Sequence, residues 1–424
     1  MQDFKNCMGM VKDIFKNKRN SRFQTISAAL LIAFIILMTS GFKCIYWNST
    51  YAGWFRNVIL FGFLIYLICN KTKGQQYHFR QEVIFMMFLP FLSIINSSMI
   101  YSQSIFHSFV ILITQFTWVL YFLLHRYRVQ EETILRVFLY VSLFIVMVQI
   151  IQQFTYPNAP FGTKSASVML ETGATEAADQ RNGLWRFRMN ENAFFTAPIL
   201  FALWSKVKSK MSARQVFFIL LLLVSVYLTL TRQVMIACIL AIFFSMFMGK
   251  KKMNLTALTL GLLLIGGLYV YYDVLFSSLA EQTKNDSDED NVRLLAAAEF
   301  WTESIKTPLT FLFGYGLPDA SSAYGVHMMQ LRLFYGFYTS DIGFIGQIFE
   351  RGFLYVCVCY YMLYKLFFKL KQIVPLYIRM FVVFTGAMSI MIFPCISPAQ
   401  TIVWVLLLYI CDLHINKSVL AINS

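Results

Sequence analysis

Twelve apolar runs of membrane-spanning length constrain this chain more than any other feature. Polar segments separate the runs, which lie at about 26–42, 54–69, 82–100, 105–124, 133–151, 191–204, 216–231, 233–248, 254–272, 341–364, 376–393 and 398–413. A helix that crosses a membrane needs about 20 mostly apolar residues. The shorter runs must therefore extend into their polar flanks.

The composition agrees with a membrane protein. Hydrophobic residues make up 58% of the chain and charged residues only 13%, whereas an ordinary soluble protein carries roughly 25% charge. We therefore predict an all-α polytopic membrane protein, with about 12 transmembrane helices forming a single integral membrane domain over residues 1–424.

The basic residues predict how the helices are oriented. If the runs cross the membrane in turn, 24 of the 36 Lys and Arg residues fall on the side that holds the N-terminal tail. Short cytoplasmic loops carry such an excess of basic residues. We expect both termini to be cytoplasmic, and we interpret the net charge of +15 as a topology signal. It does not indicate a nucleic-acid partner.

Two long polar segments then lie on the external side, at 152–190 and 273–340. The second is the large external loop, in which residues 290–306 have the apolar spacing of an amphipathic helix with an acidic start. Pro308 is expected to stop this helix. A bundle that only connects its helices needs short loops, so the two long ones predict an external functional site.

Arginines are the first candidates for that site. Arg232 lies between two apolar runs that have almost no loop between them, and a charge at a membrane boundary indicates function unless the side chain reaches the lipid headgroups. Arg186 and Arg188 alternate with aromatic residues, as either a membrane anchor or a phosphate-binding pair. Arg293 lies in the first turns of the loop helix, where its own position indicates a solvated residue.

Two residues are candidates for moving a proton. Asp341 begins an apolar run, either as a first-turn acid or as a carboxylate facing the arginines, and His327 follows a predicted turn. The chain contains no P-loop, GxSxG, HExxH or paired-cysteine metal-binding pattern. We therefore predict no metal and no cofactor.

Three motifs follow one another between residues 180 and 355. The first is Thr229-Leu-Thr-Arg-Gln-Val-Met-Ile-Ala. The second runs from Asn291-Val-Arg through Phe300-Trp and Pro308-Leu to Leu312-Phe-Gly-Tyr-Gly, and the third is Ser340-Asp-Ile-Gly-Phe-Ile-Gly with Arg351-Gly. The motifs resemble those of the superfamily of O-antigen polymerases (Wzy) and O-antigen ligases (WaaL). The resemblance lies in their order along the chain, in the side of the membrane on which they are expected, and in their distance from the C-terminus.

The resemblance implies a reaction. In that superfamily a sugar hydroxyl attacks a lipid-linked glycan and polyprenyl pyrophosphate leaves, without metal or nucleotide. It implies that Arg232 and Arg293 hold the pyrophosphate, and that Asp341 or His327 removes the acceptor proton. The ligases carry a His-Asn pair, whereas Met328 follows His327 here. This difference favours a polymerase.

We therefore predict a glycosyltransferase of the bacterial cytoplasmic (inner) membrane. It would transfer undecaprenyl-pyrophosphate-linked oligosaccharide repeat units onto one another at the outer face, in contact with membrane lipid and with a chain-length regulator protein as a further partner. One alternative is a ligase of the same superfamily. Another is a flippase or other transporter, which would have internal repeats and short loops on both sides.

Overall fold

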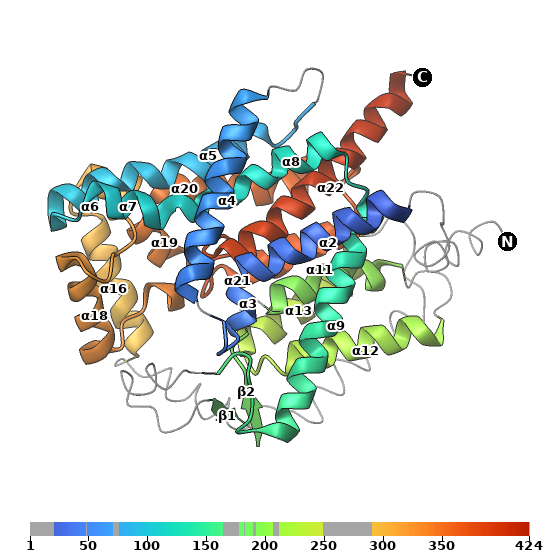
Figure 1. Cartoon of the computed structure of the whole chain (residues 1–424), viewed down its shortest axis with the longest axis horizontal. Coiled ribbons are helices and arrows are strands. Elements are labelled where there is room, and N and C mark those ends of the chain that lie inside the picture. The colour runs from blue at the N-terminus through green and yellow to red at the C-terminus, as the bar shows by residue number, and fades with distance from the viewer. Residues whose placement is uncertain are drawn as a thin grey trace.

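The computed structural model describes residues 21–47, 49–70, 76–163, 178–181, 183–189, 192–206, 212–248 and 291–423. These residues form an α-helical bundle with one small β-hairpin (Figure 1). The predicted span at 254–272 and the first part of the large loop, up to residue 290, lie outside the described residues.

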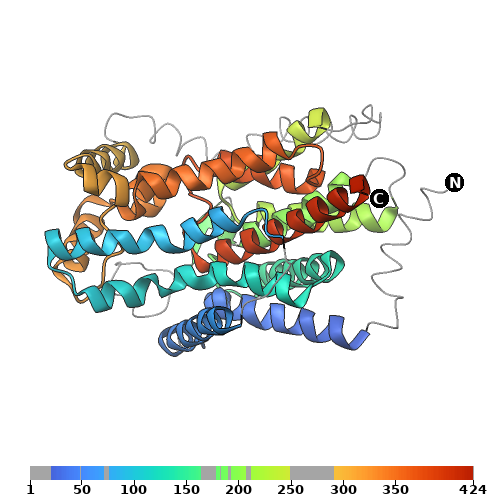
Figure 2. The ribbon, with the colours of Figure 1, turned by 90° about the horizontal axis from the view of Figure 1, so that it is seen from above.

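The described residues from 21 to 155 are mostly helical. They contain α2 (Ser21–Met38), α3 (Ser40–Lys43), α4 (Ser49–Cys69), α5 (Arg80–Phe88), η1 (Leu89–Leu92), α6 (Ser93–Tyr101), α7 (Ile105–Leu112), η2 (Ile113–Val119), α8 (Leu120–Tyr127) and α9 (Glu131–Thr155). Segments α5–α6 and α7–α8 form two long rods that lie side by side in both views (Figures 1 and 2).

The second half begins with the hairpin and continues through the helices that complete the bundle. It contains β1 (Asp179–Arg181), β2 (Leu184–Arg186), α11 (Asn192–Ser205), α12 (Ala213–Tyr227), α13 (Arg232–Met248), α16 (Val292–Ser304), α17 (Pro308–Phe313), α18 (Ala323–Tyr335), η3 (Thr339–Asp341), α19 (Gly343–Arg351), α20 (Phe353–Tyr364), η4 (Lys365–Lys369), α21 (Leu376–Met388) and α22 (Pro398–Asn423). Residues 290–306, predicted as an amphipathic helix, contain α16.

Five described helical segments are long and apolar enough to cross a membrane. They are Tyr51–Cys69, Arg80–Tyr101, Ile105–Tyr127, Glu131–Thr155 and Pro398–Val419. Shorter apolar helices cover most of the other predicted runs. The all-α prediction is confirmed for the described residues, and these helices are consistent with a multi-pass membrane protein.

Helix α22 forms the centre of the bundle. All its residues from Ile402 to Cys411 are completely buried or nearly so, and α2, α8, α9 and α11 all contact it. In Figure 2, α22 lies between α20 on one side and α2 on the other. A helix that is apolar all round is stable only when it is surrounded, which explains why this segment occupies the core.

The prediction of one helix over 341–364 is wrong, because Gly352 separates α19 from α20. Gly352 has a φ of +87°, and a Cβ there would lie 2.2 Å from the carbonyl oxygen of Leu312. The turn that follows α17 packs against the same point, where the backbone N–H of Tyr315 donates to the carbonyl of Phe349 at 2.6 Å. Because Gly352 has no Cβ, the backbone between α19 and α20 can approach the backbone at the end of α17 closely.

We expect Gly314→Ala to lower the free energy of unfolding by about 2 kcal/mol or more. Gly314 has a φ of +72°, and its added Cβ would lie 2.6 Å from the backbone nitrogens of Arg351 and Gly352. Gly336→Ala is the control, because its φ is +69° but the nearest atom is 3.3 Å away. Melting temperatures of the purified variants should fall more for Gly314→Ala. Equal losses would contradict the close packing.

Candidate anion-binding site

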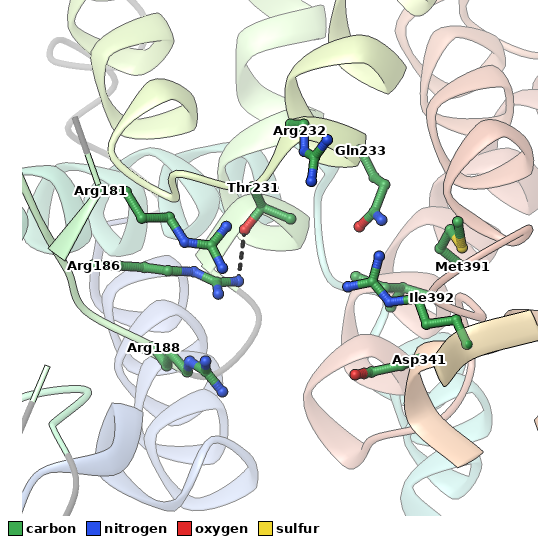
Figure 3. A pocket seen from close by; sticks show the side chains of 10 residues that line it. Arg181, Arg186, Arg188, Thr231, Arg232, Gln233, Asp341, Met391 and Ile392 are labelled. Carbon is green, nitrogen blue, oxygen red and sulfur yellow. Dashed lines mark hydrogen bonds between the residues drawn. The ribbon is translucent and has the colours of Figure 1, made fainter. Parts of the chain in front are cut away.

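A cavity of about 420 Å³ lies between the hairpin, the start of α13 and η3 (Figure 3). Five of the ten described residues that line it are arginines, and one is an aspartate. The lining residues are Arg181, Arg186, Arg188, Thr231, Arg232, Gln233, Arg293, Asp341, Met391 and Ile392. The charged side chains alone give the lining a strong positive excess, which suits an anionic ligand.

The hairpin supplies one wall of the cavity through its strand parity. β1 and β2 pair antiparallel, with Asp179 opposite Arg186 and Arg181 opposite Leu184. Alternate residues of a strand point to opposite faces, so Arg181 and Arg186 share a face and Trp185 lies on the other. There the indole of Trp185 stacks on Tyr156 at 3.8 Å between ring centroids.

The end of α9 fixes the position of the hairpin. Gln153 accepts a hydrogen bond from the backbone N–H of Trp185 at 2.9 Å and donates one to its carbonyl at 2.7 Å. This pair of bonds replaces a third strand along the edge of β2. Because Trp185 is held, its neighbour Arg186 is aimed consistently into the cavity.

The turn between α12 and α13 receives two of the arginines. Leu230 in this turn has a φ of +47°, which directs successive backbone carbonyls toward the hairpin. Arg186 donates to the Thr229 carbonyl at 3.2 Å and to the Thr231 hydroxyl at 2.9 Å, and Arg181 donates to the Leu230 carbonyl at 3.1 Å. These bonds use some of the guanidinium N–H groups and fix the planes of both side chains.

Burial is the largest cause, followed by the nearby charges of Arg181 and Arg188, and together they lower the pKa of Arg186 to about 10. Burial also lowers the pKa of Arg181, and Asp179 opposes that shift. Asp179 forms an ion pair with Arg188. A lowered pKa means that the surroundings disfavour the charged form. A bound anion would relieve this repulsion, so binding energy is available at the site.

The opposite wall holds the aspartate. Asp341 is exposed at the end of η3, whose Thr339 hydroxyl donates to the buried Glu350 carboxylate. Arg293 lies at the start of α16, where its backbone N–H is capped by the Asn291 side chain at 2.9 Å. Arg232 is the first residue of α13 and lies near the top of the cavity in Figure 3.

The structure brings together five of the six predicted site residues. Arg186, Arg188, Arg232, Arg293 and Asp341 all line the cavity. The sixth residue, His327, lies on α18, where its exposed ring stacks on Tyr101 at 5.9 Å between centroids, and it does not line the cavity.

Several lining residues were not proposed as part of the site from the sequence. Thr231 belongs to the same sequence motif as Arg232, so the motif itself could have identified it as a site residue. Met391 and Ile392 follow α21 in a short turn, and Gly343 bonds to the carbonyl of Met391 at 3.0 Å. No local pattern singles out two apolar residues of that kind.

A second cavity of about 190 Å³ adjoins the first. It shares Arg186, Arg188, Thr231 and Ile392 with the arginine cavity. Its other lining residues are mostly apolar: Lys43, Phe187, Met189, Asn192, Ala193, Phe194, Thr229, Val234 and Met388. The two cavities together place a cationic chamber beside a largely apolar one.

The fold and the site define the class of protein only broadly. It is a helical bundle with several helices of membrane-crossing length and an arginine-lined cavity at one end. Neither the protein-family models nor the curated proteins that were compared with this chain give a match.

Proposed function

We propose that the protein is a polysaccharide polymerase that joins repeat units linked to undecaprenyl pyrophosphate. The observation that carries this proposal is the cavity lined by five arginines and one aspartate. Planar guanidinium groups bind phosphate oxygens in pairs and stay charged. A pyrophosphate diester is a dianion with oxygens on both phosphorus atoms, so it can engage several arginines at once.

The proposed reaction breaks the bond between the anomeric carbon of the donor sugar and the pyrophosphate oxygen. The acceptor hydroxyl forms the new bond to that carbon and gives its proton to the Asp341 carboxylate. Negative charge grows on the leaving oxygen as its bond breaks, and Arg232 and Arg293 stabilise that charge. The atoms balance without a metal ion or a cofactor.

The charge distribution of the sequence supports an external position for this site. Residues 152–190 and 273–340 contribute Arg186, Arg188 and Arg293, and the predicted topology puts both segments outside the cytoplasmic (inner) membrane. A lipid-linked glycan would reach the cavity from the outer leaflet. A chain-length regulator protein and membrane lipid would be the other partners.

The product distinguishes this proposal from its rivals. In a strain that lacks the protein, surface glycan should carry single repeat units only, and the restored protein should restore long chains. Long chains that accumulate on the lipid carrier would instead identify a ligase. Repeat units that remain on the cytoplasmic side would identify a flippase.

We expect inorganic pyrophosphate to stabilise the purified protein. A ligand at a hundred times its Kd adds about 2.7 kcal/mol to the free energy of unfolding, which is measured as a rise in melting temperature. Arg186→Gln should reduce the rise, because it removes one of the cationic groups that face the cavity. The measurement is made at low salt, where such contacts are strongest. If pyrophosphate does not change the melting temperature of the wild-type protein, the anion site is contradicted.

A further inference from the structure

The segment between α2 and α4 contains a left-handed turn. Ser40, Gly41, Phe42 and Lys43 have φ values of +49°, +64°, +57° and +56°. For residues other than glycine this conformation costs about 1–2 kcal/mol each. Consecutive residues in this region are retained only where the surroundings enforce them, and such strain gathers at functional sites.

Side-chain contacts enforce the turn. The Thr39 hydroxyl accepts from the backbone N–H of Phe42 at 3.3 Å. The Phe42 ring is buried, with Phe144 and Phe195 at 5.5 and 6.3 Å between centroids. Trp47 covers Gly41 so closely that a Cβ would lie 2.9 Å from its ring. The turn is therefore a packed part of the fold.

Backbone hydrogen bonds connect the turn to the arginine wall. The carbonyl of Lys43 accepts from the N–H of Gly162 at 3.1 Å, and the carbonyl of Gly162 accepts from the N–H of Arg188 at 2.8 Å. The N–H of Ile45 donates to the carbonyl of Pro160 at 2.8 Å. Lys43 is thus fixed two backbone hydrogen bonds away from Arg188.

Lys43 lies at the second cavity. It is exposed, and it lines that cavity together with Arg186 and Arg188. Phe194, Val234 and Met388 are among the apolar residues of the same lining. A cation beside an apolar wall suits a ligand that has an anionic head and a hydrocarbon tail.

We propose that Lys43 is a further anion-binding residue of this site, and that the left-handed turn exists to present it where the two cavities meet. There its ammonium group contacts the pyrophosphate of an amphiphilic ligand whose first hydrocarbon units lie in the second cavity. This inference rests on the proposed function for the identity of the anion, and adds a residue from a different part of the chain.

Lys43→Gly separates binding from folding. Glycine adopts positive φ without strain, so this variant should melt at or above the temperature of the wild-type protein. Its affinity for farnesyl pyrophosphate should fall roughly fivefold to tenfold, the loss of a partly exposed charge-assisted contact. Lys43→Arg should bind within about threefold of wild type. Affinities are measured by calorimetry on the full-length protein in detergent.

Lys306→Ala is the matched control, because Lys306 is an exposed lysine paired with Glu303 at 2.5 Å and does not line either cavity. It should bind farnesyl pyrophosphate as the wild-type protein does. If Lys43→Gly also binds like wild type, the role of Lys43 is overturned while the polymerase proposal stands. If the wild-type protein binds neither farnesyl pyrophosphate nor inorganic pyrophosphate, the polymerase proposal fails and the Lys43 proposal fails with it.

Discussion

Arg232→Ala and Arg293→Ala are each expected to slow repeat-unit transfer by about a hundredfold to a thousandfold, the loss typical of one donor to a developing negative charge. Both side chains line the arginine cavity, and the leaving pyrophosphate gains charge as its bond breaks. The transfer rate is measured on purified protein with a lipid-linked repeat unit. In cells, the same variants should leave mostly single repeat units at the surface.

Arg332→Ala is the control for this experiment. Arg332 is an exposed arginine of α18 whose guanidinium lies over the Tyr338 ring at 6.0 Å, and it does not line the cavity. It should transfer at close to the wild-type rate when membrane levels are matched. Arg232→Lys should recover part of the rate only, because an ammonium group cannot make the paired contacts of guanidinium. Normal chain length in both alanine variants would refute the proposed role.

The helices could be predicted because each apolar run is visible in a short, continuous stretch of sequence. Each predicted run outside 249–290 falls largely on described helical segments, some of them divided into two or three. The break at Gly352 was missed because its cause is the carbonyl of Leu312, which lies 40 positions earlier in the sequence and 2.2 Å from a Cβ at Gly352. A contact of that range leaves no periodic signal in either segment.

The sequence predicted which residue types form the site, but it did not predict how they are arranged in space. Its arginines were found because charge is conspicuous beside apolar runs, and the topology put them on one side. The sequence does not predict that Arg186, on a hairpin, and Asp341, which follows α18, line the same cavity. Lys43 was hidden for a different reason. Its left-handed backbone depends on Trp47 and on residues 160–162, which tertiary packing brings to it.

The placement of His327 changes the balance between the two proton acceptors considered. Its ring packs on Tyr101 and is not part of the cavity lining, whereas Asp341 shares that lining with the arginines. A general base must come within hydrogen-bond reach of the proton that it removes. The geometry therefore supports Asp341 as the base in the proposed reaction.

Asp341→Asn is expected to lower kcat by about a hundredfold to ten-thousandfold, the range for loss of a general base. The same change should tighten binding of farnesyl pyrophosphate, because it removes a negative charge from a cavity whose ligand is an anion. Slower transfer with tighter binding separates a catalytic carboxylate from one that merely supports the fold, since a structural role would weaken both. His327→Ala should leave both quantities unchanged. If His327→Ala abolishes transfer and Asp341→Asn does not, the assignment of the base is reversed.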